Sequence, residues 1–265
     1  MVHARLFGIE STSQETISHM VPLLLAKISI PHRAKPLVRR ERLLRLLHDN
    51  VQRRLTLISS GAGYGKTALL VDYAHDTTLP VCWYSLDESD ADLSVFVAYL
   101  VASLGQRFPA IGSTALDELV ADSNLDNRPS SLARLLLDVI ERQTDGLFCL
   151  VLDDLHHVLC SPEIVEFLNT FIRFKTDRCS LIISSREVPQ GLSLAYWRAY
   201  GEVLVLDAAL CFDGDETIAL ARLRQSGLSH AELAWLTEQS QGWVTAILLM
   251  MDSWRGSGAP RSVPA

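Results

Sequence analysis

Short runs of consecutive apolar residues alternate along this chain with longer segments in which apolar residues recur at helical spacing. The short runs cover residues 55–58, 80–86, 147–152, 180–184 and 202–206, and they suit strands that are buried on both faces of a parallel sheet. Helical spacing covers residues 66–75, 94–104 and 130–143. Strands that alternate with helices predict right-handed crossover units. We therefore expect an α/β fold with a five-stranded parallel sheet flanked by helices.

After Asp207 the pattern is helical only, over residues 213–225, 229–239 and 242–254. This change predicts a boundary near residues 208–212, followed by a small all-α domain. Upstream, Ser161-Pro162-Glu163 is expected to begin a helix, because serine is a good N-cap, proline fits the first helical position and an acid suits the first turn.

Composition narrows the classes of protein that fit. The chain has 265 residues, of which 48% are apolar, and its net charge is −7. It can therefore bury a sizeable core, and the acidic balance argues against a main nucleic-acid-binding surface. The sequence has no run of 18 apolar residues, so it predicts no membrane-spanning helix. The first residues lack a signal-peptide pattern. The five cysteines have no C-x-x-C spacing, so we expect buried, reduced thiols in a cytoplasmic protein.

The segment "SSGAGYGKTALL", residues 59–70, lies between a predicted strand and a predicted helix. It nearly matches the phosphate-binding loop G-x-x-x-x-G-K-[ST], with Ser60 at the first glycine position. In such a loop, backbone N–H groups and the helix N-terminus bind phosphate oxygens. Glycines 61, 63 and 65 are expected to take positive φ. The predicted nucleotide-binding residues of the loop are Ser60, Gly61, Ala62, Gly63, Tyr64, Gly65, Lys66, Thr67 and Ala68.

Two aspartates follow the predicted strand "LFCLVL" and should lie at the carboxyl edge of the sheet, beside this loop. Asp153 is expected to hold Mg²⁺ together with the hydroxyl of Thr67. Asp154 could then polarise an attacking water as a general base. An acidic strand end exposed to solvent is the structural alternative.

Arg186 follows the predicted strand at 180–184 and should reach the same edge, where a guanidinium can contact a γ-phosphate. The predicted catalytic residues are therefore Lys66, Asp154 and Arg186. His156, His157 and Cys160 lack a fourth ligand for a zinc site. His156 is expected to orient the turn at Asp153 and Asp154 instead.

The order of these motifs resembles the STAND class of P-loop ATPases, and more narrowly the ATPase module of large LuxR-type, MalT-like transcriptional regulators. The matching stretches are "KISIPHRAKPLVRRERLLRLL", the phosphate loop, "WYSLDESD", "LVLDDLHHV", "LIISSRE" and "SQGWVTAILLM", and together they span about residues 22–254. By motif match, Val38 and Arg40 are carried over to nucleotide contact. Arg39 stands where the broader class often has glycine.

The resemblance implies a switch that rests with ADP, is active with ATP, and resets by slow hydrolysis in the presence of Mg²⁺. It implies cytoplasmic location, and self-association in the ATP state or contact with further regulator domains. We expect no membrane contact, and no direct DNA binding by this chain, because no DNA-reading helix is recognisable in it. The implied division is an N-terminal extension (1–30), a P-loop domain (31–210), a partial helical domain (211–254) and a flexible tail (255–265).

Two other functions stay open at this point. A P-loop kinase for a small molecule would need an acceptor site and usually an arginine-bearing lid. Paired aspartates followed by an arginine on another strand suit attack by water better. A nucleotide-binding assembly module that does not hydrolyse ATP would keep the same motifs, so the sequence does not separate it from the switch.

Overall fold

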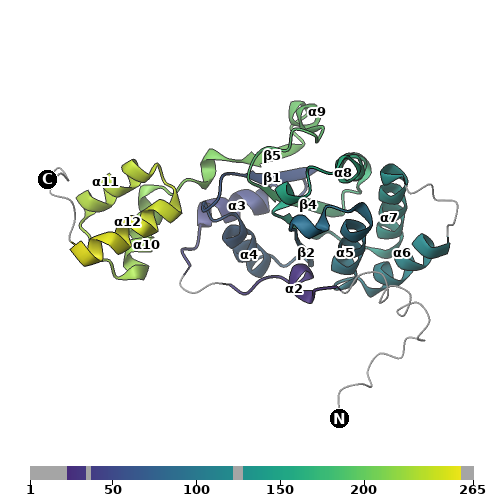
Figure 1. Cartoon of the computed structure of the whole chain (residues 1–265), viewed down its shortest axis with the longest axis horizontal. Helices are drawn as coiled ribbons and strands as arrows, with labels where there is room; N and C mark the ends of the chain where they lie inside the picture. The colour runs from purple at the N-terminus through teal and green to yellow at the C-terminus, as the bar shows by residue number, and fades with distance from the viewer. Residues whose placement is uncertain (1–22, 34–36, 122–127, 258–265) are drawn as a thin grey trace, which may run out of the picture.

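The computed structural model describes residues 23–33, 37–121 and 128–257 (Figure 1). Within them, five parallel strands form one sheet in the order β2-β3-β4-β1-β5. The predicted five-stranded parallel sheet is thereby confirmed. The strands are β1 (Leu55–Ser59), β2 (Val81–Ser85), β3 (Phe148–Asp153), β4 (Cys179–Ser185) and β5 (Val203–Leu206).

Every residue of the central strands β1, β3 and β4 is buried, which explains their continuous apolar runs. Successive side chains of β1 point to opposite faces of the sheet. Leu55 and Leu57 pack into the core on one face, and Ile58 packs into the core on the other. The sheet therefore has a hydrophobic layer on both sides.

Helices cover both faces of the sheet (Figure 1). Residues of α3 (Glu41–Asp49) and α4 (Lys66–Asp76) build one core. The other core includes residues of α2 (Leu25–Ile28), α5 (Leu93–Gly105), α6 (Pro109–Ala121), α7 (Pro129–Gln143) and α8 (Pro162–Phe174). The start of α8 is as predicted, since the Ser161 side chain accepts a hydrogen bond from the Ile164 N–H. The sequence pattern did not predict α2, α6 or α9 (Leu194–Ala199).

Residues 23–30, assigned from the sequence to an N-terminal extension, pack on the sheet and its helices, which together we call the sheet body. The Lys27 ammonium is buried and lies 2.9 Å from a carboxylate oxygen of Asp90 and 2.8 Å from one of Asp87. These aspartates lie in the second half of the "WYSLDESD" stretch, just after β2. The ion pairs therefore tie the segment before the phosphate loop to the turn that follows β2. Residues 1–22 lie outside the described part.

Beyond β5, residues 211–257 form what we call the helical module, which has three helices: α10 (Gly214–Arg224), α11 (His230–Ser240) and α12 (Val244–Ser257). The first two begin with capping boxes, Asp213 with Glu216 and Ser229 with Glu232. The module has its own core, which includes Leu220, Leu236, Ile247 and Met251. The helix α12 continues three residues into the stretch predicted as a tail, and residues 258–265 lie outside the described part. The predicted domain boundaries stay predictions.

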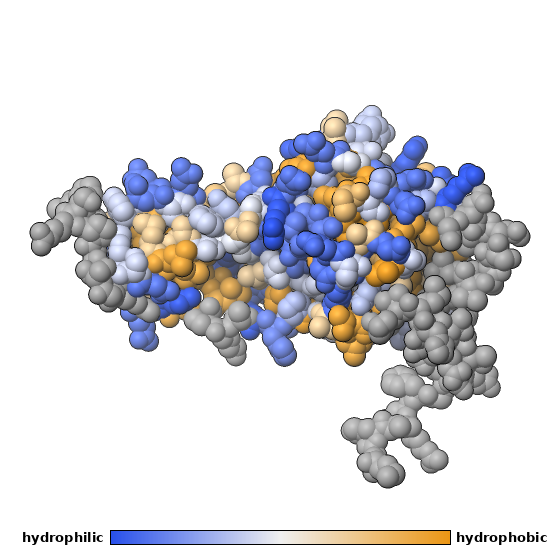
Figure 2. All heavy atoms as spheres, viewed as in Figure 1, coloured by the Kyte–Doolittle hydropathy of each residue, from blue (hydrophilic) through white to orange (hydrophobic). Residues whose placement is uncertain are grey.

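The surface of the helical module carries apolar side chains (Figure 2). Leu223, Trp243 and Leu249 are among its exposed large apolar residues. Among the residues that the structure describes, no helix is both long enough and apolar enough to cross a membrane. Cys82, Cys149 and Cys179 are buried, as expected from the apolar runs around them, but the expectation is wrong for Cys160, which is exposed, and for Cys211, which is half-buried.

Candidate functional site

The loop between β1 and α4, residues 60–65, turns at two glycines. Gly63 has φ 79° and Gly65 has φ 82°, in the left-handed region that favours glycine, and Gly65 caps the N-terminus of α4. The expectation that Gly61 also takes positive φ is wrong. The chain leaves β1 in ordinary backbone conformations, and the reversal is concentrated on either side of Tyr64.

Beyond Ser60, the backbone donors of this loop have no acceptor among the described residues. From Gly61 to Ala68, no N–H donates a hydrogen bond to a described residue. The first N–H groups of α4 are among these, and a helix N-terminus carries partial positive charge. Consecutive free donors at a helix start form a binding site for an anion such as a phosphate group.

Ser60 replaces the first glycine of the motif without disturbing the loop. Its N–H donates to the Ser185 carbonyl at 3.3 Å, which continues the pairing of β1 with β4 by one residue. Its φ is not positive, so a side chain is tolerated there. The departure from the motif therefore leaves the backbone donors of the loop in place.

Lys66 lies across the loop, where its ammonium donates to the carbonyl oxygens of Ser60 at 2.8 Å and Gly61 at 3.0 Å. Burial lowers the pKa of Lys66. The negative charges of Asp154 and Asp153 oppose this change, and the positive charge of Arg186 adds to it. Of the predicted catalytic residues, Asp154 and Arg186 are thus each close enough to Lys66 to influence its ammonium. Arg186 directly follows β4 and is exposed.

Thr67 and Asp153 are in direct contact. The Thr67 hydroxyl donates to a carboxylate oxygen of Asp153 at 2.9 Å, and the Ser184 hydroxyl donates to the other oxygen. Asp153 is only 2% exposed. Burial raises the pKa of this carboxyl, against the lowering effect of the hydrogen bond from Ser184. A hydroxyl and a buried carboxylate at the carboxyl edge of the sheet are hard oxygen ligands, and they fit Mg²⁺.

Asp154 adopts a left-handed backbone conformation, with φ 60° and ψ 42°. This conformation is unfavourable for residues other than glycine, and strained residues of this kind concentrate at functional sites. The Asp154 N–H donates to the Ser184 hydroxyl at 2.8 Å, so the same serine fixes both aspartates. The Asp154 carboxylate lies 3.7 Å from the imidazole of His156, but neither ring nitrogen of His156 has a hydrogen-bond partner among the described residues, so the orienting role of that histidine stays a prediction.

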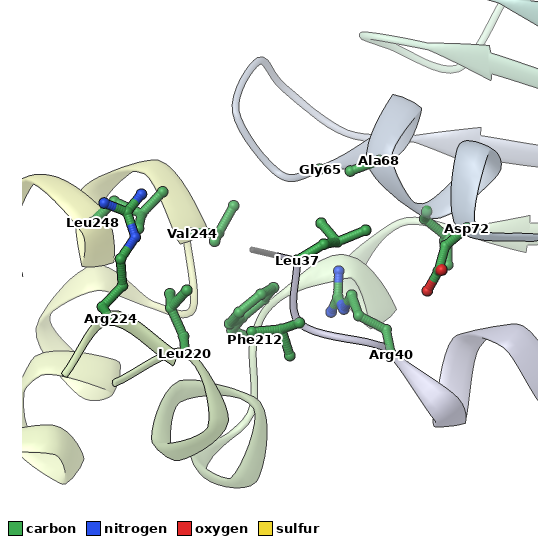
Figure 3. A pocket seen from close by; sticks show the side chains of 12 residues that line it. Leu37, Arg40, Gly65, Ala68, Asp72, Phe212, Leu220, Arg224, Val244 and Leu248 are labelled. Carbon is green, nitrogen blue, oxygen red and sulfur yellow. The ribbon is translucent and has the colours of Figure 1, made fainter. Parts of the chain in front are cut away.

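A pocket adjoins the start of α4 (Figure 3). One wall comes from Gly65, Ala68, Leu69 and Asp72, and the segment at residues 37–40 lies between this wall and the helical module. The module supplies the other wall. Its lining residues are Phe212, Leu220, Arg224, Val244 and Leu248. The predicted contact residues Val38 and Arg40 both line the pocket.

The Arg40 guanidinium is already engaged by the helical module. It donates to the two carboxylate oxygens of Glu216 at 3.1 and 2.9 Å and to the Cys211 carbonyl at 3.2 Å. It also lies over the Phe212 ring, with 4.6 Å between the guanidinium carbon and the ring centroid. Arg39, where the broader class often has glycine, instead pairs with Asp76 at 2.6 Å. Arg40 therefore joins the segment at residues 37–40 to the helical module.

A second connection lies at the phosphate loop. The Trp243 indole N–H donates to the Ala62 carbonyl at 2.9 Å, and the Thr245 hydroxyl donates to the Gly63 carbonyl at 3.0 Å. Sequence reasoning found the Gly-Trp motif but not these contacts, nor those of Glu216. No local signal could show them, because the partners are 181, 182 and 176 residues apart.

The chain is similar to several known proteins. The family described as Nephrocystin 3, N-terminal, matches residues 34–186. MalT, an HTH-type transcriptional regulator, is 34% identical over 231 residues in Yersinia pestis strain Pestoides F, covering 86% of this chain and 25% of that protein. The Cronobacter sakazakii MalT is 34% identical over 240 residues, with 89% and 26% coverage. The chain spans about a quarter of the length of these relatives.

Among solved structures, a signal transduction ATPase with numerous domains (STAND) from Pyrococcus horikoshii, which carries a tetratricopeptide repeat sensor, matches with a TM-score of 0.52. It is 18% identical, and the match covers 83% of this chain and 30% of that chain. At this identity the match supports the fold alone. Together the comparisons confirm the predicted resemblance to MalT-like regulators and to the fold of STAND ATPases.

Proposed function

The chain belongs to the Nephrocystin 3 N-terminal family, and from this premise we propose that it is a nucleotide-dependent switch module that binds ATP and ADP and hydrolyses ATP slowly. One observation carries the proposal. The free N–H groups of the phosphate loop and a pocket bounded by the helical module meet at Gly65 and Ala68, at the start of α4. A nucleotide with its phosphates on the loop and its base in the pocket would touch both the sheet body and the helical module.

Each predicted site residue has a role in this proposal. The loop N–H groups and Lys66 would bind the phosphates, and Val38 and Arg40 would border the base. Thr67 and Asp153 would hold Mg²⁺, which would supply positive charge to offset that of the phosphates. Asp154 would orient and polarise the attacking water, and Arg186 would contact the γ-phosphate.

The switch follows from the position of the helical module. Because the module forms one wall of the pocket and contacts the loop, ATP and ADP can favour different module positions if they interact differently with the two arrangements. In a longer, MalT-like regulator this movement would reach further domains or a second copy of the chain. The exposed apolar residues Leu223, Trp243 and Leu249 offer a surface for such contacts. We place this module in the cytoplasm, where a transcriptional regulator acts.

Thermal unfolding with and without ADP and Mg²⁺ tests the proposal. A ligand at 100 times its Kd adds about 2.7 kcal/mol to the free energy of unfolding, so ADP should raise Tm clearly in the wild type. Lys66→Ala should largely remove this rise. Ser60→Gly, which restores the first motif glycine, is the matched control in the same loop and should keep it. An equal rise of Tm in Lys66→Ala and the wild type would overturn the proposal.

A further inference from the structure

The first residues of α12 and those just before it bind the outward face of the phosphate loop. Trp243 donates to the Ala62 carbonyl, and Thr245 donates to the Gly63 carbonyl with both its hydroxyl, at 3.0 Å, and its backbone N–H, at 3.3 Å. Two consecutive carbonyl groups of the loop are therefore held by the helical module.

Peptide geometry gives these contacts a consequence on the opposite side of the loop. In a planar trans peptide, the carbonyl of one residue and the N–H of the next point in opposite directions. Holding the Ala62 and Gly63 carbonyls toward the module therefore turns the N–H groups of Gly63 and Tyr64 away from it. Neither N–H has an acceptor among the described residues. These are two of the donors that the loop offers to an anion.

The contact is closely fitted. A Cβ atom at position 63 would lie 2.2 Å from the Thr245 hydroxyl oxygen and 2.8 Å from the Trp243 indole nitrogen. Both distances are far below van der Waals contact, and Gly63 also has φ 79°. The ring of Tyr64 lies beside that of Trp243, with 6.3 Å between centroids. Glycine is therefore required at position 63 by the module as well as by the turn.

We propose that Trp243 and Thr245 are positioning residues of the phosphate loop, which aim the N–H groups of Gly63 and Tyr64 at the phosphates of the nucleotide. This inference rests on the proposed function. It makes phosphate binding depend on the docked helical module, and by reciprocity phosphates strengthen the docking. A nucleoside without phosphates uses only the pocket, so it gains nothing from these two residues.

The test compares ADP with adenosine by calorimetry in the double variant Trp243→Phe/Thr245→Val. Phenylalanine keeps an aromatic ring without the N–H, and valine keeps the shape of threonine without the hydroxyl. Loss of two neutral hydrogen bonds should weaken ADP binding by about tenfold. Adenosine binding should stay within about twofold, because the pocket wall is unchanged. This ratio would not move if the two residues served only to keep the chain folded.

The control variant is Trp235→Phe/Thr237→Val, which makes the same chemical changes in the same module. Trp235 packs against Trp254 with 5.5 Å between ring centroids, and the Thr237 hydroxyl donates to the Leu233 carbonyl, so both side chains have their contacts within the module. ADP affinity should remain that of the wild type. A second measurement is amide exchange of the Thr245 N–H in the wild type, which ADP should slow more than adenosine does.

Three results would overturn the inference: unchanged ADP affinity in the double variant, equal losses for ADP and adenosine, or equal protection of the Thr245 N–H by both ligands. Each is distinct from a failure of the proposed function. If ADP binds the wild type and Lys66→Ala weakens it, the proposed function stands while any of these results removes the positioning role. If ADP does not bind the wild type at all, both fail together.

Discussion

The ion pair between Arg40 and Glu216 should stabilise the docking of the helical module, and a double-mutant cycle measures by how much. Arg40→Met keeps an unbranched apolar side chain and removes the guanidinium, together with its contact over the Phe212 ring. Glu216→Gln keeps an oxygen that can accept from the Asp213 N–H in the capping box, where Glu216 accepts at 3.3 Å. The cycle compares both single variants and the double variant with the wild type.

The magnitude follows from burial and geometry. The two side chains are 6% and 10% exposed, and they form two hydrogen bonds of 3.1 and 2.9 Å. Removing one partner of a buried pair costs about 3–5 kcal/mol. Each partner keeps other contacts, since Arg42 lies 3.7 Å from Glu216 and the Cys211 carbonyl lies 3.2 Å from Arg40. We therefore expect each single variant to lower the free energy of unfolding by about 2–3 kcal/mol, at or below the lower end of that range.

In the double variant no unpaired charge of this pair stays buried. The double variant should therefore lose about 3 kcal/mol in the free energy of unfolding, less than the roughly 5 kcal/mol that the two single variants lose together. The coupling energy is then about 2 kcal/mol. The assay is urea unfolding, followed by tryptophan fluorescence and by circular dichroism. Coincidence of the two signals shows whether the module, which has its own core, unfolds with the sheet.

The exposed pair Asp138 and Arg142, with nitrogen and oxygen 2.9 Å apart and side chains 68% and 46% exposed, is the control. Its coupling energy should be below about 0.5 kcal/mol, as for helix surface pairs four residues apart. If the Arg40 and Glu216 variants were additive within about 0.5 kcal/mol, the pair would not couple the module to the body and the reasoning would be refuted.

Three more predictions follow from the site. Gly63→Ala should weaken ADP binding at least tenfold in calorimetry, because its Cβ would lie 2.2 Å from the Thr245 oxygen, and wild-type affinity would contradict this contact. Asp154→Asn, which tolerates the left-handed backbone, should abolish phosphate release from ATP while ADP affinity stays unchanged, and continued turnover would exclude Asp154 as the base. Asp87 is subject to burial, which raises its pKa, but Lys27 and Ser89 outweigh this and lower the pKa to about 2. Because the folded pKa lies below the unfolded one, the stability that Asp87 contributes is present above about pH 4 and lost as the pH falls through about 2. The difference in the free energy of unfolding between the wild type and Asp87→Asn should therefore shrink as the pH falls from about 4 and vanish below about pH 2, and a difference that stays undiminished below pH 2 would contradict this account.

Local sequence patterns were sufficient for the sheet and its edge. The apolar runs at β1 and β3 are short and are bounded by polar or turn residues, as suits strands that are buried on both faces. Because parallel strands end at one edge of the sheet, the sequence placed Asp153 beside the loop that leads to Thr67, and in the structure the two side chains are hydrogen-bonded at 2.9 Å. The helix α9 escaped prediction because six residues are too few to show helical spacing.

The contacts between the sheet body and the helical module were decided only by the tertiary structure. The sequence by itself determined that a phosphate loop is present, since strand, glycines, lysine and helix are contiguous in the chain. It could not show that Glu216 takes up the Arg40 guanidinium, or that Trp243 and Thr245 hold the loop from outside. Those contacts join residues more than 170 positions apart, and they depend on how two separately built cores pack together. Periodicity reports which face of an element is buried, whereas the partner on that face is set by packing in three dimensions.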